Sequence, residues 1–235
     1  MNDSISIMQP YIFPYLGYFH LIESSKLFVF YDDVHYIKKG WINRNRILLN
    51  GKDFLFTIPV KKVSQNKLIN EIEPAIDKKW KQVFFKTLEF AYKKAPYYKE
   101  VIALIDDVFN ANYTDITDLC IKSIETVYSY LGEKINYVKS SQFAPETKGI
   151  DKADRLIAIT KKAHYHKYSN AIGGQALYHK EYFRGKGVDL FFVKSQLKEY
   201  KQFDNEFVKG LSIIDVLMFN DIEVVRSFLR DFELI

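Results

Sequence analysis

The sequence predicts an α/β fold of the Rossmann-like type, a mostly parallel sheet with a helical insert and C-terminal helices. The first observation is a short apolar strand over 4–8, then helical spacing at Phe19 and Ile22, then a second apolar strand over 27–31. A strand–helix–strand order favours parallel pairing with one hand of crossover. The second observation is that strands and helices alternate again after a helical middle. We therefore expect a single domain over 1–235 with the helical insert at 66–132.

The loop after the first strand is the first predicted site. Gln9-Pro10 ends the strand because proline lacks a backbone donor, and Pro14 precedes the helix. Ligands of open α/β sheets bind outside the carboxyl ends of the strands. We expect contacts from the Gln9 amide, from the flat Tyr11 ring, and from Gly17, where a ligand can approach the backbone. Gln9 and Gly17 have structural alternatives, since they can also pin the loop and let the helix pack tightly.

Two titratable residues beside this loop are the predicted catalytic pair. His20 lies on the first turns of the helix, where it could act as a general base or bind phosphate. A single helical histidine is often a core or surface residue instead. Asp32 and Asp33 end the second strand, where neighbouring side chains point in different directions. We expect one of them to cap a loop, and Asp33 to face the site and orient His20.

A basic segment over 41–46 is the predicted anion clamp. Arginine binds phosphate or carboxylate through two parallel bonds, and a flanking tryptophan can stack on a ring. We assign this role to Trp41, Asn43, Arg44 and Arg46. The alternative is a solvated basic loop that leads into a hairpin, whose turn is Asn50-Gly51 between strands at 46–49 and 53–58.

The middle region is predicted to be helical. Apolar residues recur at helical spacing in two runs that Pro96 separates: Trp80, Val83, Phe84, Leu88 and Ala91, then Val101, Leu104, Ile105 and Val108. A third helix is predicted to begin at a Thr114 cap, end at Gly132 and carry the single cysteine, Cys120, on its buried stripe. We therefore expect a core thiol and not a nucleophile.

The last third supplies the remaining candidate contacts. Its predicted strands are 135–138, 165–169 and 189–193, and its predicted helices are 153–163, 176–183, 212–219 and 222–228. The loop with Gly173 and Gly174 precedes a helix and can present backbone N–H groups to an anion, with Tyr178 one turn further on. Arg155 can reach an anion or form an exposed ion pair. Ser212 is a predicted helix N-cap, with Asp215 at the third helical position completing a near capping box, and its hydroxyl could also meet phosphate.

Several motifs resemble those of the WbqC-like family. The family's opening pattern is matched at Gln9, Pro10, Phe13, Pro14, Leu16, Gly17, Tyr18, Phe19 and His20. The resemblance continues through 32–34, 41–46, 173–178 and 206–215, so it covers most of the chain. It implies an accessory enzyme of bacterial surface-polysaccharide assembly, of the O-antigen and lipopolysaccharide type, that transfers an acyl or aminoacyl group to the amino group of a nucleotide-linked sugar. The alternative is a non-catalytic module that binds a nucleotide sugar or a carrier within a biosynthetic complex.

The order of the N-terminal elements is also similar to that of nucleotidylyltransferase-like folds. Those folds use a paired-histidine helix start to hold a triphosphate. The first histidine of that pair is missing here, and Pro14 or Tyr15 stands near its place. The similarity therefore favours a nucleotide-sized site over adenylyl transfer.

Composition and charge narrow the remaining possibilities. The formal net charge is +5, from 34 Lys and Arg against 29 Asp and Glu, which fits an anionic small molecule and is too small to indicate nucleic acid. No apolar run approaches the roughly 18 residues of a membrane span, and no leader signal follows Met1 and Asn2, so we expect a cytoplasmic protein. His164 and His166 lack partners at metal spacing, so no metal site is predicted. The cofactor and the oligomeric state are unknown from the sequence.

Overall fold

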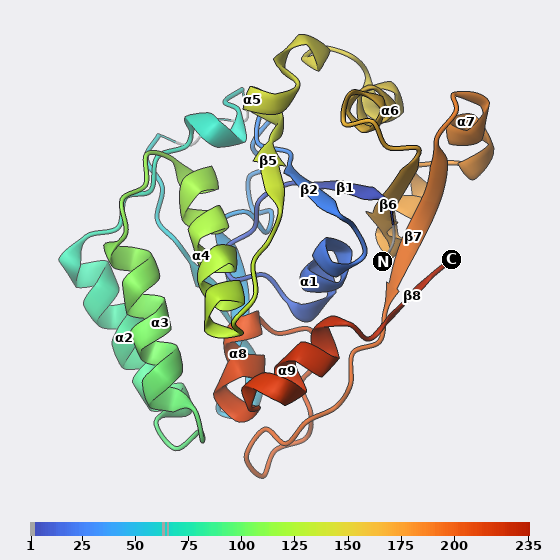
Figure 1. Cartoon of the computed structure of the whole chain (residues 1–235). Coiled ribbons are helices and arrows are strands. Elements are labelled where there is room, and N and C mark those ends of the chain that lie inside the picture. Colours follow the sequence, from blue (N-terminus) through green and yellow to red (C-terminus); the bar gives the residue numbers. More distant parts are fainter. Residues whose placement is uncertain (1–2, 63, 65) are drawn as a thin grey trace.

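The computed structural model describes residues 3–62, 64 and 66–235 (Figure 1). The expected lack of a leader at Met1 and Asn2 therefore lies outside the described residues. A six-stranded sheet has the spatial order β5-β2-β1-β6-β7-β8. Its strands are β1 (Ile5–Met8), β2 (Leu27–Phe30), β5 (Tyr137–Lys139), β6 (Lys167–Ala171), β7 (Asp189–Ser195) and β8 (Phe232–Leu234). All neighbours pair in parallel except β7 and β8, so the predicted mostly parallel sheet is confirmed.

The direction in which the chain adds strands reverses between β1 and β6. From β1 the chain moves outward to β2 and β5, and it then returns to β6 and continues outward to β7 and β8. The segments that leave the carboxyl ends of β1 and β6 therefore diverge, and a reversal of this kind leaves a crevice beyond the strand ends. The segment after β1, Gln9–Tyr15, is called the first loop below.

Helices cover both faces of the sheet (Figure 1). The α-helices are α1 (Leu16–Glu23), α2 (Lys78–Tyr92), α3 (Tyr98–Asn110), α4 (Ile116–Tyr130), α5 (Ser140–Phe143), α6 (Lys152–Lys162), α7 (Lys180–Gly185), α8 (Ile213–Phe219) and α9 (Ile222–Leu229). The 3-10 helices are η1 (Ile69–Glu71), η2 (Pro145–Thr147) and η3 (Ile172–Ala176). The larger core joins one sheet face to α1, α4, α8 and α9, and the smaller core joins the other face to α6 and α7. None of the helices in the described part of the chain has the length and apolar character needed to cross a membrane.

A two-stranded hairpin of β3 (Arg44–Leu49) and β4 (Lys52–Thr57) packs beside the larger core. Its turn residues Asn50 and Gly51 have φ of 52° and 72°, as the predicted type I′ turn requires. The chain then forms α2, α3 and α4 before it returns to β5. Phe56 of the hairpin packs against Phe84 of α2, with ring centroids 5.1 Å apart.

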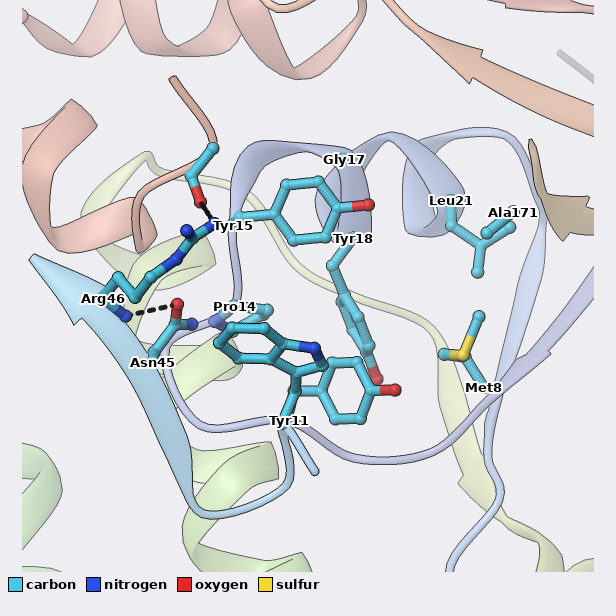
Figure 2. A pocket seen from close by; sticks show the side chains of 12 residues that line it. Met8, Tyr11, Pro14, Tyr15, Gly17, Tyr18, Leu21, Asn45, Arg46 and Ala171 are labelled. Carbon is cyan, nitrogen blue, oxygen red and sulfur yellow. Dashed lines mark hydrogen bonds between the residues drawn. The ribbon is translucent and has the colours of Figure 1, made fainter. Parts of the chain in front are cut away.

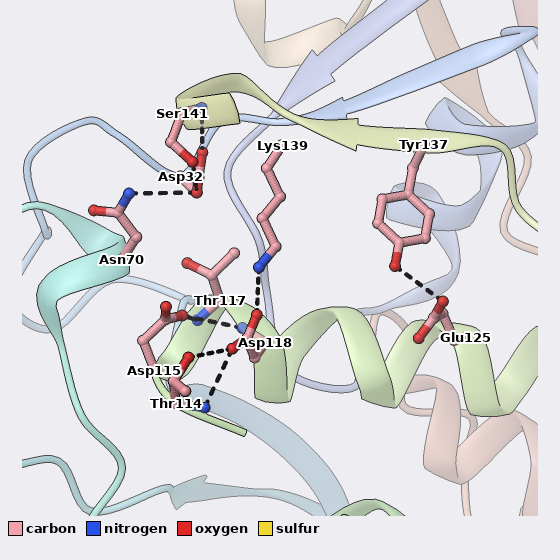
Figure 3. Close-up of polar contacts among 10 residues, drawn as sticks. All are labelled: Asp32, Asn70, Thr114, Asp115, Thr117, Asp118, Glu125, Tyr137, Lys139 and Ser141. Atoms are coloured by element: carbon pink, nitrogen blue, oxygen red, sulfur yellow. Dashed lines mark hydrogen bonds and ion pairs between the residues drawn. The ribbon is translucent and has the colours of Figure 1, made fainter. Parts of the chain in front are cut away.

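The cap of α4 differs from the prediction (Figure 3). The Asp115 carboxylate accepts the backbone N–H groups of Thr117 and Asp118, so Asp115 and not Thr114 is the N-cap. The Thr114 hydroxyl instead donates to Asp118, 2.5 Å away. Asp118 also pairs with Lys139 of β5, which joins the start of α4 to the edge of the sheet.

Two serines, one directly before β1 and one within it, allow α1 to lie close to the sheet. Ser4 and Ser6 are fully buried, and their hydroxyls donate to the backbone carbonyls of Ser24 and Leu21 at 2.8 and 3.0 Å. A buried hydroxyl is costly only when it has no partner, so these small polar residues are stable between strand and helix.

A buried carboxylate fixes the long segment between β7 and α8. Asp215, in the first turn of α8, accepts hydrogen bonds from Tyr92, Tyr200 and Gln202 at 2.8, 2.6 and 2.6 Å. Burial raises the pKa of Asp215. The expected capping box between Ser212 and Asp215 is therefore wrong, because the carboxylate turns into the core and holds the segment that leads to Gly210.

Candidate functional site

A pocket of about 390 Å³ lies beyond the ends of β1 and β6, at the reversal point of the sheet (Figure 2). We call it the first pocket. Its lining residues are Met8, Tyr11, Pro14, Tyr15, Gly17, Tyr18, Leu21, Trp41, Asn45, Arg46, Ala171 and Gly210. The volume falls within the range of small-molecule sites. Four residues predicted as ligand contacts, Tyr11, Gly17, Trp41 and Arg46, thus surround one cavity.

The walls of the first pocket are aromatic and carry one cation. The Tyr11 and Tyr18 rings lie 5.4 Å apart, and the Tyr18 hydroxyl donates to the Gln9 carbonyl at 2.8 Å. The Arg46 guanidinium lies 5.5 Å from the centre of the Trp41 ring, which is 43% exposed. Burial raises the pKa of Tyr11, so at neutral pH its hydroxyl is a hydrogen-bond donor and not an anion. This arrangement suits a ligand with a flat ring and a nearby negative charge.

The first loop is held by side chains from distant segments. The Asn45 amide donates to the carbonyls of Ile12 and Phe13 at 3.2 and 2.7 Å. The Ser212 hydroxyl also donates to the Phe13 carbonyl, and Ser123 accepts the Phe13 N–H at 3.0 Å. Phe13 has a φ of 38°, a conformation that side chains other than glycine rarely adopt. Such strain persists only where the surroundings determine it, so the loop is rigid before any ligand binds.

Gly17 makes room for a neighbouring ring. A Cβ atom at this position would lie 2.4 Å from Cε2 of Tyr15 and 2.7 Å from its hydroxyl oxygen. The glycine therefore lets the Tyr15 ring fold over the start of α1 and form part of the pocket wall. Neither of the two roles expected for Gly17 included this one.

A second pocket of about 450 Å³ lies beside the segment that follows β2. We call it the second pocket. Its lining residues are Tyr31, Asp33, Val34, His35, Leu68, Lys148, Gly149, Ile150, Lys152, Arg155, Leu156 and Tyr178. It brings together three more residues predicted as site residues, Asp33, Arg155 and Tyr178. Asp33 Oδ2 and the Arg155 guanidinium form a buried ion pair at 2.5 Å.

The two adjacent aspartates have different tasks. Asp32 accepts the backbone N–H and the hydroxyl of Ser141 at 2.9 and 2.6 Å, so it caps α5, and the Asn70 amide lies 3.4 Å away (Figure 3). Asp33 faces the second pocket and contacts the Ser140 hydroxyl and Arg155. Asp32 thus caps a helix and not a loop, and Asp33 faces a pocket other than the predicted one, where its partner is Arg155 and not His20.

His20 does not line either pocket. It is fully buried, and its Nε2 lies 2.7 Å from the Phe228 carbonyl at the end of α9. Its ring packs on Phe232, with centroids 5.8 Å apart. Burial lowers the pKa of His20, so the ring is neutral in the native protein. The expected pair of His20 as base and Asp33 as its orienter does not form, because this face of α1 is covered by α9 and β8.

Two residues of the basic segment stabilise the fold near the first pocket. Asn43 is buried, accepts the Tyr36 hydroxyl at 2.6 Å and donates to the Ile58 carbonyl at 2.7 Å. The Arg44 guanidinium donates to the Gly40 carbonyl at 2.9 Å and does not line the first pocket. Asn45, which was not among the predicted ligand contacts, holds the first loop through Ile12 and Phe13.

The remaining predicted contacts lie outside both pockets. The hydroxyl of Ser212 is used within the protein, because it donates to the first loop and caps α8. Gly173 and Gly174 lie in η3, which has no buried residue. The side chain of Gln9 is half-buried, and its carbonyl, not its amide, has the recorded role at the pocket rim.

The described part of the chain contains neither a cluster of metal ligands nor an exposed thiol. Within residues 3–62, 64 and 66–235, no group of three or more His, Cys, Asp or Glu could hold a metal ion. Cys120 is fully buried, its thiol lies 3.3 Å from the Ile42 carbonyl, and burial raises its pKa well above the usual value. A thiol in this environment is a core residue.

Comparison with known proteins gives two matches. The sequence profile of the WbqC-like protein family matches residues 9–227, which include every residue of both pockets except Met8. A protein of Mycobacterium tuberculosis (strain ATCC 25618 / H37Rv), with the name Uncharacterized protein Rv1507c, is 26% identical over 230 residues, and the alignment covers 96% of this chain and 97% of that protein. No solved structure matches the chain significantly.

Proposed function

Because the chain belongs to the WbqC-like protein family, we propose that it binds a nucleotide-linked amino sugar in the first pocket and transfers an acyl or aminoacyl group to the sugar's amino group. The products would enter bacterial surface-polysaccharide synthesis of the O-antigen type. A cytoplasmic location, where nucleotide-linked sugars are available, is part of the proposal.

The observation that carries this proposal is the combination of aromatic rings and one arginine at the reversal point of the sheet. A base or sugar can stack on Trp41 or on the tyrosine rings, and a phosphate can pair with Arg46. The Arg46 guanidinium pairs with Asp53 at 3.2 Å and lies 3.5 Å from the Gly210 carbonyl, and its Nε has no hydrogen-bond partner among the described residues. A phosphate in the pocket would therefore compete with Asp53 for this guanidinium.

The strand order supports a nucleotide at this position. If the hairpin strands are left out and the six sheet strands are numbered along the chain, β5-β2-β1-β6-β7-β8 becomes 3-2-1-4-5-6. This is the order of Rossmann-like folds, which bind dinucleotides at the reversal point. We therefore propose that the fold is Rossmann-like.

The proposed reaction needs positioning more than proton abstraction. The sugar nitrogen attacks the acyl carbonyl carbon, a C–N bond forms, the bond to the leaving group breaks, and the amine proton ends on the leaving group. Burial raises the pKa of Tyr15 as well as that of Tyr11, so both hydroxyls remain donors that can stabilise the developing oxyanion.

Intrinsic fluorescence tests the binding step. The chain has two tryptophans, so the Trp80→Phe variant leaves Trp41 as the single probe of the first pocket. We expect a UDP-linked amino sugar to quench this signal saturably, and Arg46→Ala to weaken binding by about tenfold. Arg184→Ala, an exposed arginine on α7 far from the pocket lining, is the matched control. Equal binding by all three proteins would contradict the proposal.

A non-catalytic sugar-binding module is the second candidate. One observation favours it, because none of the described residues that line the first pocket carries a carboxylate or an imidazole. Mass spectrometry of the sugar after incubation with an acyl donor separates the candidates. An N-acylated product supports the transferase, and saturable binding without product supports the module.

A further inference from the structure

We propose that the second pocket binds the donor of the transferred group, an acyl chain carried as a thioester or ester on a phosphate-bearing molecule. This inference rests on the proposed function, since a transferase needs sites for two substrates. The second pocket is separate from the first, has a similar volume and lies at the same end of the sheet.

The interior of the second pocket is mostly apolar. Its walls are the rings of Tyr31 and Tyr178 and four aliphatic side chains, Val34, Leu68, Ile150 and Leu156. Each buried methylene contributes favourably on transfer from water, so a short acyl chain gains affinity in such a cavity. A free sugar, with a hydroxyl on nearly every carbon, would find few partners here.

The floor of the pocket is charged but internally neutralised. Arg155 and Asp33 are 3% and 5% exposed and pair with each other. The Arg155 guanidinium lies 4.7 Å from the centre of the Tyr31 ring, and its Nε donates to the Thr147 hydroxyl at 3.2 Å. Both groups have partners, so the floor holds its shape and attracts no further ion.

The rim of the pocket is cationic. Lys148 and Lys152 are exposed, and neither forms an ion pair with a described residue. The charged lining residues are three cations and one carboxylate, an excess of two positive charges. An apolar interior with a cationic rim suits an amphipathic anion whose acyl group is buried and whose phosphate stays at the surface.

The two pockets meet at hydrogen-bonded strand ends. Tyr31, which lines the second pocket, donates its backbone N–H to the carbonyl of Met8, which lines the first, at 2.8 Å. Adjacent strands lie about 5 Å apart. We place the acyl carbonyl and the amine on either side of this pair of strand ends, where residues of the two pockets are hydrogen-bonded to each other. The amine displaces the thiol or alcohol of the donor, which leaves with the proton.

Calorimetric titration of the full chain with butyryl-coenzyme A tests the inference. We expect saturable binding, about tenfold tighter than that of coenzyme A alone because the acyl carbons are buried. The Lys148→Ala/Lys152→Ala double variant should bind butyryl-coenzyme A about tenfold more weakly. Lys161→Ala, on the exposed side of α6 and outside both pockets, should bind like the wild type.

Parallel fluorescence titrations with the UDP-linked amino sugar separate this inference from the proposed function. Sugar binding that is unchanged in the double lysine variant, with weakened butyryl-coenzyme A binding, supports two separate substrate sites. Sugar binding without any butyryl-coenzyme A binding overturns the donor site and leaves the proposed function intact. Equal affinity for coenzyme A and its butyryl form, or an equal effect of inorganic phosphate, also overturns it, because the acyl group would then be outside the pocket.

Discussion

The first loop and η3 occupy equivalent positions but are built differently. Each leaves the carboxyl end of one of two adjacent parallel strands, β1 and β6. The backbone of the first loop is held at Phe13 by side chains from β3, α4 and the start of α8. No residue of η3 is buried. Position at the reversal point therefore makes both segments candidates for ligand contact, but only the first is organised before binding.

The largest difference between the first loop and η3 is expected when two matched asparagines, Asn45 of β3 and Asn170 of β6, are replaced. Asn45 and Asn170 are 6% and 5% exposed, and each accepts the backbone N–H of the following residue at 2.8 Å. Asn45 alone also donates to the first loop. We expect Asn45→Ala to lower the free energy of unfolding by about 2–3 kcal/mol, because two buried carbonyls lose a donor, and to abolish sugar binding.

Urea denaturation measures the stability part of this prediction. Asn170→Ala is the matched control and should cost only about 1 kcal/mol, because it removes a single local bond. Equal losses in the two variants would mean that the first loop is no better anchored than η3.

The Gly17→Ala substitution displaces the Tyr15 side chain from the lining of the first pocket and leaves the other lining side chains unchanged. The added methyl group would overlap the far end of the Tyr15 ring, and because Tyr15 is 37% exposed its side chain can move aside. We expect about tenfold weaker sugar binding with little change in thermal stability. Gly185→Ala, where an added Cβ meets nothing within 4 Å, is the control for the substitution itself. Unchanged affinity in Gly17→Ala would remove Tyr15 from the site.

The pH dependence of the melting temperature tests the contribution of His20, the residue that joins α1 to the end of α9. Burial lowers the pKa of His20 below the usual 6.5, so its contribution to stability is present above pH 6.5 and is lost as the pH falls through the native value. His20→Gln keeps a donor near the Phe228 carbonyl and cannot titrate. We expect its melting temperature to fall less than that of the wild type between pH 7 and pH 5. Parallel curves would show that His20 does not contribute to acid sensitivity.

The smallest effect is expected at η3. Gly173 has open space around it, so Gly173→Ala should change stability by no more than about 0.5 kcal/mol. Sugar binding should also stay the same, because the proposed phosphate contact is Arg46. A loss of sugar affinity in this variant, measured by Trp41 fluorescence, would restore the role that the sequence suggested for the glycine loop.

Local signals predicted most of the elements. The Asn50-Gly51 turn, the end of α4 two residues before Gly132 and the sheet strands up to β7 follow from local residue patterns. The sequence does not predict β8, because three residues directly after a helix are too few to show the polar and apolar alternation of a strand. The predicted helix over 176–183 is instead η3 followed by α7, since the glycines and His179 interrupt a continuous helix.

The site could be predicted only in part, because long-range packing decides which face of an element points where. The sequence predicts contacts from the aromatic first loop and from Arg46, and the structure places both at the first pocket. The orientation of His20 depends on Phe228, some 208 positions away in the chain, and no local pattern contains that information. Similarly, Asn45 and Asn43 are equally polar in the sequence, and only the tertiary structure shows that one holds the loop and the other the hairpin.

The bond between Ser212 and Phe13 joins positions 199 residues apart, so the first pocket depends on nearly the entire chain. A contact of this separation has a large loop-closure entropy, which the packing of the intervening chain must offset. A ribosome-bound chain that has not yet released the start of α8 lacks this clamp on the first loop, whatever structure its N-terminal half has reached. The proposed sugar binding would then appear only near the end of synthesis, once α8 has joined the first loop.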